Sequence, residues 1–136
     1  MDYTFFSQAA QAILEANGPS MLSAIYAPRT FAELDRLTDS TGQPLQSPRS
    51  FQAMRHFITN QVPTDLGAGT NETEVYIGDF ANLWVGMRTD ARIETSRTAE
   101  DAFSKLEVLV RIYARLDIAV VRPAHFAVVH GLVPAA

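Results

Sequence analysis

The sequence predicts an α+β protein with a small mixed sheet, two helices and a long antiparallel β-ribbon. Three observations indicate this class. Residues 4–16 place apolar side chains at helical spacing, whereas residues 87–96 and 106–121 alternate apolar and polar side chains with the period of two that strands show. Helical and strand patterns also follow one another without the regular alternation of a parallel α/β fold, which favours α+β.

The first part of the chain predicts two helices. Residues 4–16 form the first, which an Asn-Gly-Pro sequence ends. The second is short and covers residues 31–37. Thr30 and Glu33 stand three positions apart at its start, the spacing at which a side chain and the backbone cap one another, so they predict a capping box.

The strands predicted outside the ribbon are short apolar runs bounded by turn-forming residues. A polar turn at 39–48 and a Gly-rich surface loop at 64–73 separate them. The predicted strands are residues 21–27, 54–62, 74–80 and 125–132.

Residues 106–121 predict the longest strand. Sixteen residues that each advance ~3.3 Å would reach roughly 50 Å, several times the usual strand length. Residues 87–96 also alternate and are the nearest partner, and the charged and small residues between the two runs predict a connecting loop. Each strand has one apolar side and one charged side, so the ribbon is expected to need cover from other polypeptide.

The charges predict the register of this ribbon. In an antiparallel hairpin the numbers of opposed residues add up to a constant, and a total of 205 makes all three charged pairs attractive, whereas 203 would oppose Arg92 to Arg111 and 207 would oppose Arg92 to Arg115. Each pair contributes only a few tenths to about 1 kcal/mol, but the reversal of sign across three pairs favours 205. The pairs in that register are Glu94 with Arg111, Asp90 with Arg115 and Arg88 with Asp117.

Composition limits the possible classes. A chain of 136 residues with 47% hydrophobic and 19% charged residues is typical of one globular domain. Without cysteine there are no disulfides and no thiolate metal sites. The net charge of −4 disfavours a general nucleic-acid-binding surface, and we expect neither a signal peptide nor a membrane span.

The residues that could carry chemistry favour structural roles. His56 stands alone, and His125 and His130 are five apart, a spacing that suits neither a helix face nor one side of a strand. Asp79 follows a glycine and is expected to cap a turn. We therefore predict no catalytic, cofactor-binding or metal-binding residue, and an enzyme built around Asp79, His56 or His125 is the weakest alternative.

Several short motifs carry a resemblance to a known family. They are residues 26–31 (YAPRTF), 39–45 (DSTGQPL), 78–83 (GDFANL), 92–94 (RIE) and 117–123 (DIAVVRP). In their order and spacing they resemble the C-terminal part of the major capsid proteins of tailed bacteriophages, over roughly residues 15–133. Each motif alone is weak, but together they are fairly specific.

The resemblance implies an organisation of the chain. Residues 1–53, with two helices and one strand, would belong to an axial domain around capsomer symmetry axes, and residues 123–136 would return to it as the final strand. Residues 54–86 would hold strands and the exposed loop, and residues 87–122 the long ribbon of a peripheral domain. Members of the family carry an N-terminal arm, an extended loop and a spine helix before the matched region, and this sequence is expected to lack all three.

The leading functional hypothesis is a structural subunit, or a C-terminal portion of one, in a phage or prophage capsid. It implies no catalysis and no cofactor, assembly in the bacterial cytoplasm and location in the virion. Partners would be copies of the chain or of a full-length capsid protein, with scaffold or portal proteins as further candidates, but no specific nucleic-acid sequence and no membrane. A stand-alone capsid-like binding module that interferes with a phage shell is the alternative.

The residues predicted to contact other subunits lie on the charged side of the ribbon and at its base. They are Trp84, Arg88, Asp90, Arg92, Glu94, Arg111, Arg115 and Asp117.

Overall fold

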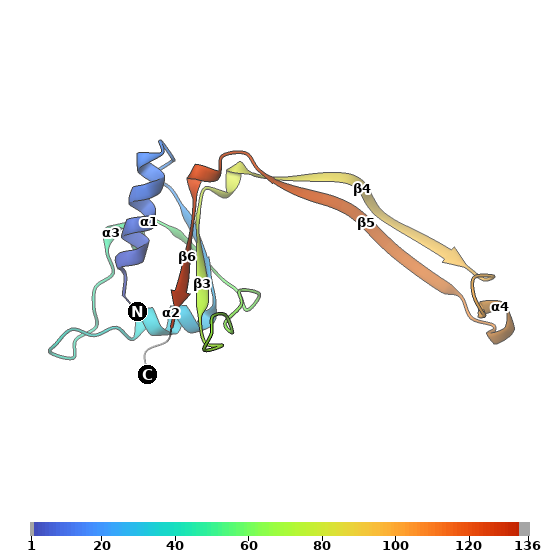
Figure 1. Cartoon of the computed structure of the whole chain (residues 1–136), viewed down its shortest axis with the longest axis horizontal. Coiled ribbons are helices and arrows are strands. Elements are labelled where there is room, and N and C mark those ends of the chain that lie inside the picture. Colours follow the sequence, from blue (N-terminus) through green and yellow to red (C-terminus); the bar gives the residue numbers. More distant parts are fainter. Residues whose placement is uncertain (1, 134–136) are drawn as a thin grey trace. The chain divides into compact units, whose positions relative to one another are not determined.

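A computed structural model describes residues 2–133 and divides the chain into two compact units. The sheet unit comprises Met1–Asn82 with Arg122–Ala136, and the ribbon comprises Leu83–Val121. The predicted α+β class is confirmed, because a mixed four-stranded sheet with helices occupies the first unit and an antiparallel pair of strands the second (Figure 1). No helix within residues 2–133 has the length and apolar character needed to cross a membrane.

The sheet unit contains most of the helices and strands. In chain order these are α1 (Thr4–Glu15), β1 (Ser23–Tyr26), α2 (Pro28–Asp35), α3 (Arg49–Gln52), β2 (Arg55–Ile58), β3 (Thr73–Gly78), the 3-10 helices η1 (Phe80–Asn82) and η2 (Pro123–His125), and β6 (Phe126–Leu132). The ribbon contains β4 (Leu83–Ser96), α4 (Ala102–Lys105) and β5 (Leu109–Val120). The two predicted helices are present, and the sequence did not indicate the four-residue helices α3 and α4.

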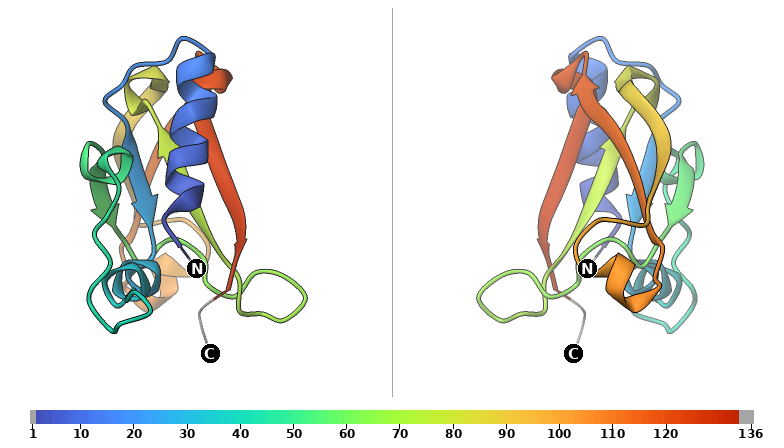
Figure 2. Two further views of the ribbon diagram at one scale, coloured as in Figure 1. Left: turned by 90° about the vertical axis from the view of Figure 1, so that its left-hand side faces the viewer. Right: turned by 90° about the vertical axis from the view of Figure 1, so that its right-hand side faces the viewer.

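The core lies between α1 and one face of the sheet. The strands are ordered β2-β1-β3-β6, with β1 parallel to β2 and antiparallel to β3. Helix α1 runs along the strands (Figure 2) and buries Phe6 and Ile13 against Tyr26, Val75 and Ile77, each at most 1% exposed. The helical spacing of its apolar residues therefore places them against the alternate residues of β1 and β3 that face the helix.

The start of α2 corrects one prediction. The helix begins at Pro28 with Ala27 as its N-cap, and no side chain caps it, so the capping box of Thr30 and Glu33 is wrong. Proline suits the first helical position because its φ is already helical and it has no N–H to leave unpaired there. Thr30 consequently lies inside the helix, where it is fully buried.

Gly78 allows β3 and β6 to approach closely. A Cβ at this position would lie 2.8 Å from the carbonyl oxygen of His125 and closer still to the ring of Phe126. The absence of a side chain lets Phe126 lie over the end of β3, where its ring meets that of Phe80 edge to face at 5.5 Å.

The buried position of Phe6 generates a stability prediction. We expect Phe6→Ala to lower the free energy of unfolding by about 3–5 kcal/mol, because it removes a fully buried ring and leaves a cavity beneath the sheet. The matched control is Phe57→Ala, whose ring is 54% exposed, for which we expect a loss of about 1 kcal/mol. Urea denaturation followed by far-UV circular dichroism measures both, and equal losses would contradict the assignment of the core.

Candidate functional site

The ribbon is the strongest candidate for a functional surface. The predicted hairpin is confirmed, since β4 and β5 pair antiparallel over 14 and 12 residues (Figure 1). The predicted unbroken strand from residue 106 is too long, however. Leu106 adopts a left-handed φ of 55° after α4, and this ends the connection before β5 begins at Leu109.

The register changes along the ribbon. At the base of the ribbon Met87 opposes Leu116, so the numbers of opposed residues add up to 203. Thr89 then opposes Arg115, and beyond this point Arg92 opposes Tyr113, so the residue numbers add up to 205. Each change inserts one extra residue in β4, as β-bulges do. Two bulges restore the alternation of faces, so the same side of β5 remains apolar along its length.

Only part of the predicted register is therefore correct. The pair Glu94–Arg111 is confirmed, but Asp117 opposes Gly86 and Arg115 opposes Thr89, so the other two predicted pairs are wrong. The reason lies at the base of the ribbon. In the register that adds up to 203, apolar residues of the two strands oppose one another: Leu83 and Val120, Val85 and Ile118, and Met87 and Leu116. The register that adds up to 205 would have placed Leu83 opposite Arg122.

One face of the ribbon is apolar and open. Its main side chains are each 56–68% exposed: Val85, Met87, Ile93, Val110, Ile112, Leu116 and Ile118. A two-stranded hairpin is marginally stable in water without a layer against which its apolar face can pack. A contiguous apolar face of this kind is typical of a surface that contacts another polypeptide.

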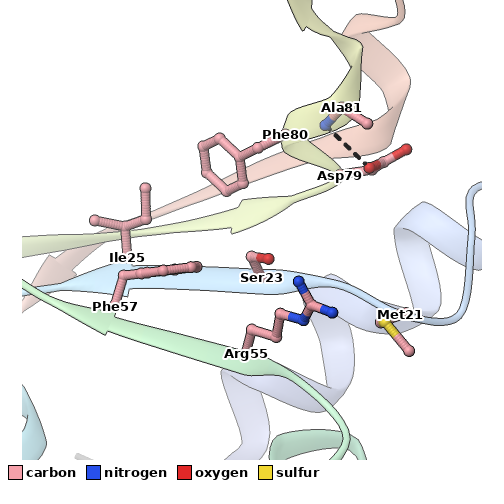
Figure 3. A pocket seen from close by; sticks show the side chains of 8 residues that line it. All are labelled: Met21, Ser23, Ile25, Arg55, Phe57, Asp79, Phe80 and Ala81. Atoms are coloured by element: carbon pink, nitrogen blue, oxygen red, sulfur yellow. Dashed lines mark hydrogen bonds between the residues drawn. The ribbon is translucent and has the colours of Figure 1, made fainter.

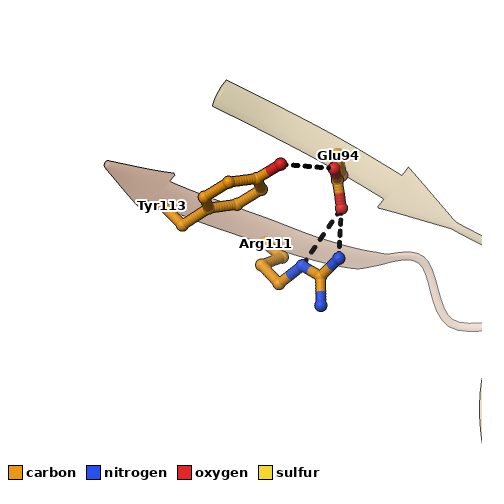
Figure 4. A network of polar contacts seen from close by, with 3 residues as sticks. All are labelled: Glu94, Arg111 and Tyr113. Carbon is orange, nitrogen blue, oxygen red and sulfur yellow. Dashed lines mark hydrogen bonds and ion pairs between the residues drawn. The ribbon is translucent and has the colours of Figure 1, made fainter. Parts of the chain in front are cut away.

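The opposite face carries a small polar network near the far end of the ribbon. Glu94 accepts a hydrogen bond from Nε of Arg111 at 3.1 Å, forms an ion pair with the same guanidinium, and accepts a hydrogen bond from the hydroxyl of Tyr113 at 3.0 Å (Figure 4). The hydrogen bond from Arg111, and then that from Tyr113, lower the pKa of the Glu94 carboxyl. All three side chains are at least partly exposed, so the network contributes specificity of register more than stability.

The structure brings only two of the eight predicted contact residues together, Glu94 and Arg111. Trp84 opposes Ala119 and is 65% exposed, so it is not a core residue. Arg92 opposes Tyr113, while Arg88 and Asp90 lie where the register shifts. Among the described residues no ion pair forms at the remaining charged positions: Arg88, Asp90, Arg92, Arg115 and Asp117.

The residues of the enzyme alternative are satisfied by structural contacts. Asp79 accepts a hydrogen bond from the amide of Ala81 at 3.2 Å, the predicted turn role, and another from the side chain of Asn82 at 2.6 Å. Asn82 also lies 3.4 Å from Nδ1 of the buried His125. The sequence spacing did not indicate this cluster, because β6 brings His125 to η1 from 43 positions along the chain.

His56 lies elsewhere, on the α1 side of the sheet. It contacts the hydroxyl of Tyr26 at 3.2 Å and the carbonyl oxygen of Phe51 at 2.9 Å. His130 pairs with Glu74 at 2.9 Å. The three histidines do not converge, and within residues 2–133 no three His, Asp or Glu side chains are placed to hold a metal ion.

Solved structures define the fold. The chain superposes on a subunit of a virus-like particle from Pyrococcus furiosus with a TM-score of 0.59 at 17% identity, covering 92% of this chain and 48% of that one. It superposes on the capsid subunit of an empty GTA particle with a TM-score of 0.68 at 17% identity, covering 91% and 42%. The fold is therefore that of capsid shell subunits.

The sequence shows the family. The phage capsid family matches residues 6–131, and the chain belongs to it. The major capsid protein of Klebsiella oxytoca phage phiKO2 is 26% identical over 102 residues, which cover 66% of this chain and 24% of that protein. The resemblance drawn from the short motifs is confirmed. The chain spans about a quarter of this curated relative and less than half of either solved subunit.

The Glu94 network generates a prediction for pH dependence. A carboxyl whose pKa is lower in the folded state stabilises that state above its unfolded pKa, and this contribution is lost as the pH falls through the folded pKa. We expect the Glu94 carboxyl to titrate below the normal range of glutamates, and Arg111→Gln to return its pKa towards that range. Arg115→Gln is the matched control, because Arg115 opposes Thr89 and leaves the network intact.

Carbon-detected NMR titration of the Glu94 side chain measures this pKa in each variant. An unchanged pKa in Arg111→Gln, or an equal change in both variants, would contradict the predicted role of Arg111.

Proposed function

We propose that this chain is a structural subunit, or the C-terminal portion of one, of a tailed-phage or prophage capsid that assembles into the hexamers and pentamers of an icosahedral shell around DNA. Membership of the phage capsid family and the fold of capsid shell subunits support this function. The observation that carries it is the open apolar face of the ribbon, which is too large and too regular for a free surface.

We assign the parts of the chain by analogy with the family. The sheet unit would correspond to the axial domain around capsomer symmetry axes, and the ribbon to the peripheral domain. The proposed role is non-catalytic. The protein would be assembled in the bacterial cytoplasm and would be part of the virion. The resemblance implies scaffold or portal proteins as further partners.

Both faces of the ribbon would serve as subunit contacts. The apolar face would lie against polypeptide of the same or a neighbouring subunit. Each Å² of apolar surface removed from water contributes about 25 cal/mol of favourable free energy to such a contact. On the other face, Arg92, Arg115 and Trp84 are exposed and would contact acidic or apolar groups of neighbours. Such charged contacts select the partner and its register more than they add affinity.

An assembly assay tests this function. We expect the chain, co-expressed with a full-length capsid subunit of the same phage or prophage, to enter particles, and Ile112→Asp to reduce its incorporation at least about tenfold by placing a charge on a surface that assembly buries. Ser104→Asp, an exposed position outside the strands, is the charge-matched control and should enter normally.

Size-exclusion chromatography with light scattering and electron microscopy of the particles measure incorporation. A chain that remains strictly monomeric and never enters particles would overturn the proposal. Binding only to the outside of completed shells would instead favour a module that interferes with them.

A further inference from the structure

The sheet of the sheet unit has a second face, which α1 does not cover. Because paired residues of neighbouring strands point to the same side, the register places one row of side chains across all four strands of this open sheet face. The row consists of Phe57, Ile25, Tyr76 and Val128. Phe57 and Val128 are 54% and 44% exposed, so this row presents apolar surface to solvent.

Above this row the open sheet face is hollowed. A cavity of about 490 Å³ lies there, and its apolar lining comes from Met21, Ile25, Phe57 and Phe80. Figure 3 shows the side chains of Arg55 and Asp79 among the residues that line it. Among the described residues Arg55 forms no ion pair. The hollow therefore combines an apolar lining with two charged groups near the end of the sheet where β1 and β2 begin. The Asp79 carboxylate already accepts hydrogen bonds from Ala81 and Asn82, whereas the Arg55 cation has no ion-pair partner within residues 2–133.

The outer face of α1 lies on the opposite side of the same unit. The exposed residues of α1 are Thr4, Ser7, Gln8, Gln11, Ala12, Leu14 and Glu15. Glu15 is the only ionisable side chain in the helix, and its carboxylate accepts a hydrogen bond from the neutral amide of Gln11 at 2.7 Å. This face is small, mostly uncharged and acidic at one end, which complements the open sheet face.

The side chains of Glu15 and Arg55 lie near the same end of the sheet unit. The last turn of α1 carries Glu15, and residues 16–22 lead from it to Ser23, the partner of Arg55 in the parallel pair of β1 and β2. The first turn lies at the other end, where the hydroxyl of Tyr3 donates to the carbonyl oxygen of Leu34 at 2.8 Å. A second copy placed beside the first without inversion would therefore bring its Glu15 to the level of Arg55.

We infer that the open sheet face packs against the outer face of α1 in a second copy of this chain, with Arg55 against Glu15 of that copy. Each sheet would then have helices on both faces, one of its own and one from its neighbour, the three-layer arrangement that buries a sheet completely. Since the contact joins different surfaces, it repeats from copy to copy and closes a ring where the rotation allows. This inference rests on the proposed function and names the surfaces by which neighbouring sheet units meet.

A symmetric dimer of two open sheet faces fits less well. If strands align with strands, β2 of one copy lies over β6 or β2 of the other, and neither strand carries a carboxylate on this face. The carboxylates on this side of the sheet already have partners: Glu74 is bonded to Tyr76 and His130, and Asp79 to Ala81 and Asn82. Arg55 would then be desolvated against Phe126 or against the end of β2, which costs free energy without a compensating charge.

Disulfide trapping tests the inference in the full chain, which has no cysteine of its own. We expect the double variant Glu15→Cys/Arg55→Cys to form a ladder of dimers, trimers and larger species under mild oxidation, because each copy presents both halves of the contact. The single variants should give little crosslinking. Glu15→Cys/Arg36→Cys is the matched control, since Arg36 follows α2 and lies outside the open sheet face.

A ladder no stronger than that of the control, or dimers formed equally by Arg55→Cys alone, would overturn the inference; the second result would indicate the symmetric dimer instead.

Charge reversal provides a readout without oxidation. We expect Arg55→Glu to weaken self-association by about two- to fivefold in sedimentation velocity, the range for one exposed ion pair, and Glu15→Arg/Arg55→Glu to restore it. Failure of the double variant to recover would contradict the pairing. Ile112→Asp should leave the ladder unchanged, because it alters only the ribbon. If the chain without Ile112→Asp enters particles normally but gives no ladder, only this inference is refuted. If that chain gives the ladder but never enters particles, only the proposed function of the ribbon is refuted.

Discussion

A two-stranded ribbon has no second layer of its own, and this constraint governs the molecule. Its backbone hydrogen bonds are satisfied only between β4 and β5, and the side chains of its apolar face have nothing within the ribbon against which to pack. In a larger sheet or a barrel, neighbouring strands would supply that cover. The proposal that other polypeptide supplies this cover is therefore supported both by membership of the phage capsid family and by the physics of the ribbon.

The two bulges in β4 reconcile two demands on the ribbon. At the base, apolar residues of both strands must lie opposite one another, which requires one register. Near the far end, Glu94 and Arg111 attract one another only in a register shifted by two positions. A single bulge would have turned one strand over and mixed apolar with charged side chains, whereas two bulges shift the register and keep the faces separate.

Polar residues in the sheet unit make structural contacts near the ends of its strands. Asp79, Asn82 and His125 hold the 3-10 turn that leads out of β3 against the segment that leads into β6. His56 is held by Tyr26 and Phe51 on the other side of the sheet. The ionisable groups are thus used to fix the ends of strands, and the surfaces available for binding are the apolar face of the ribbon and the open sheet face.

Periodicity alone determined the class, the first helix, the hairpin and its two faces, because alternation and helical spacing are local properties of the chain. The resemblance of short motifs added the family. Local signals did not determine the start of α2, where Pro28 overrode the capping box, or the end of the connection at Leu106, whose left-handed backbone no pattern indicates. The bulges, the cluster around His125 and the pairing of Ser23 with Arg55 depend on contacts between distant segments. Only tertiary packing decides these features, because the free energy of each alignment is set by partners far apart along the chain.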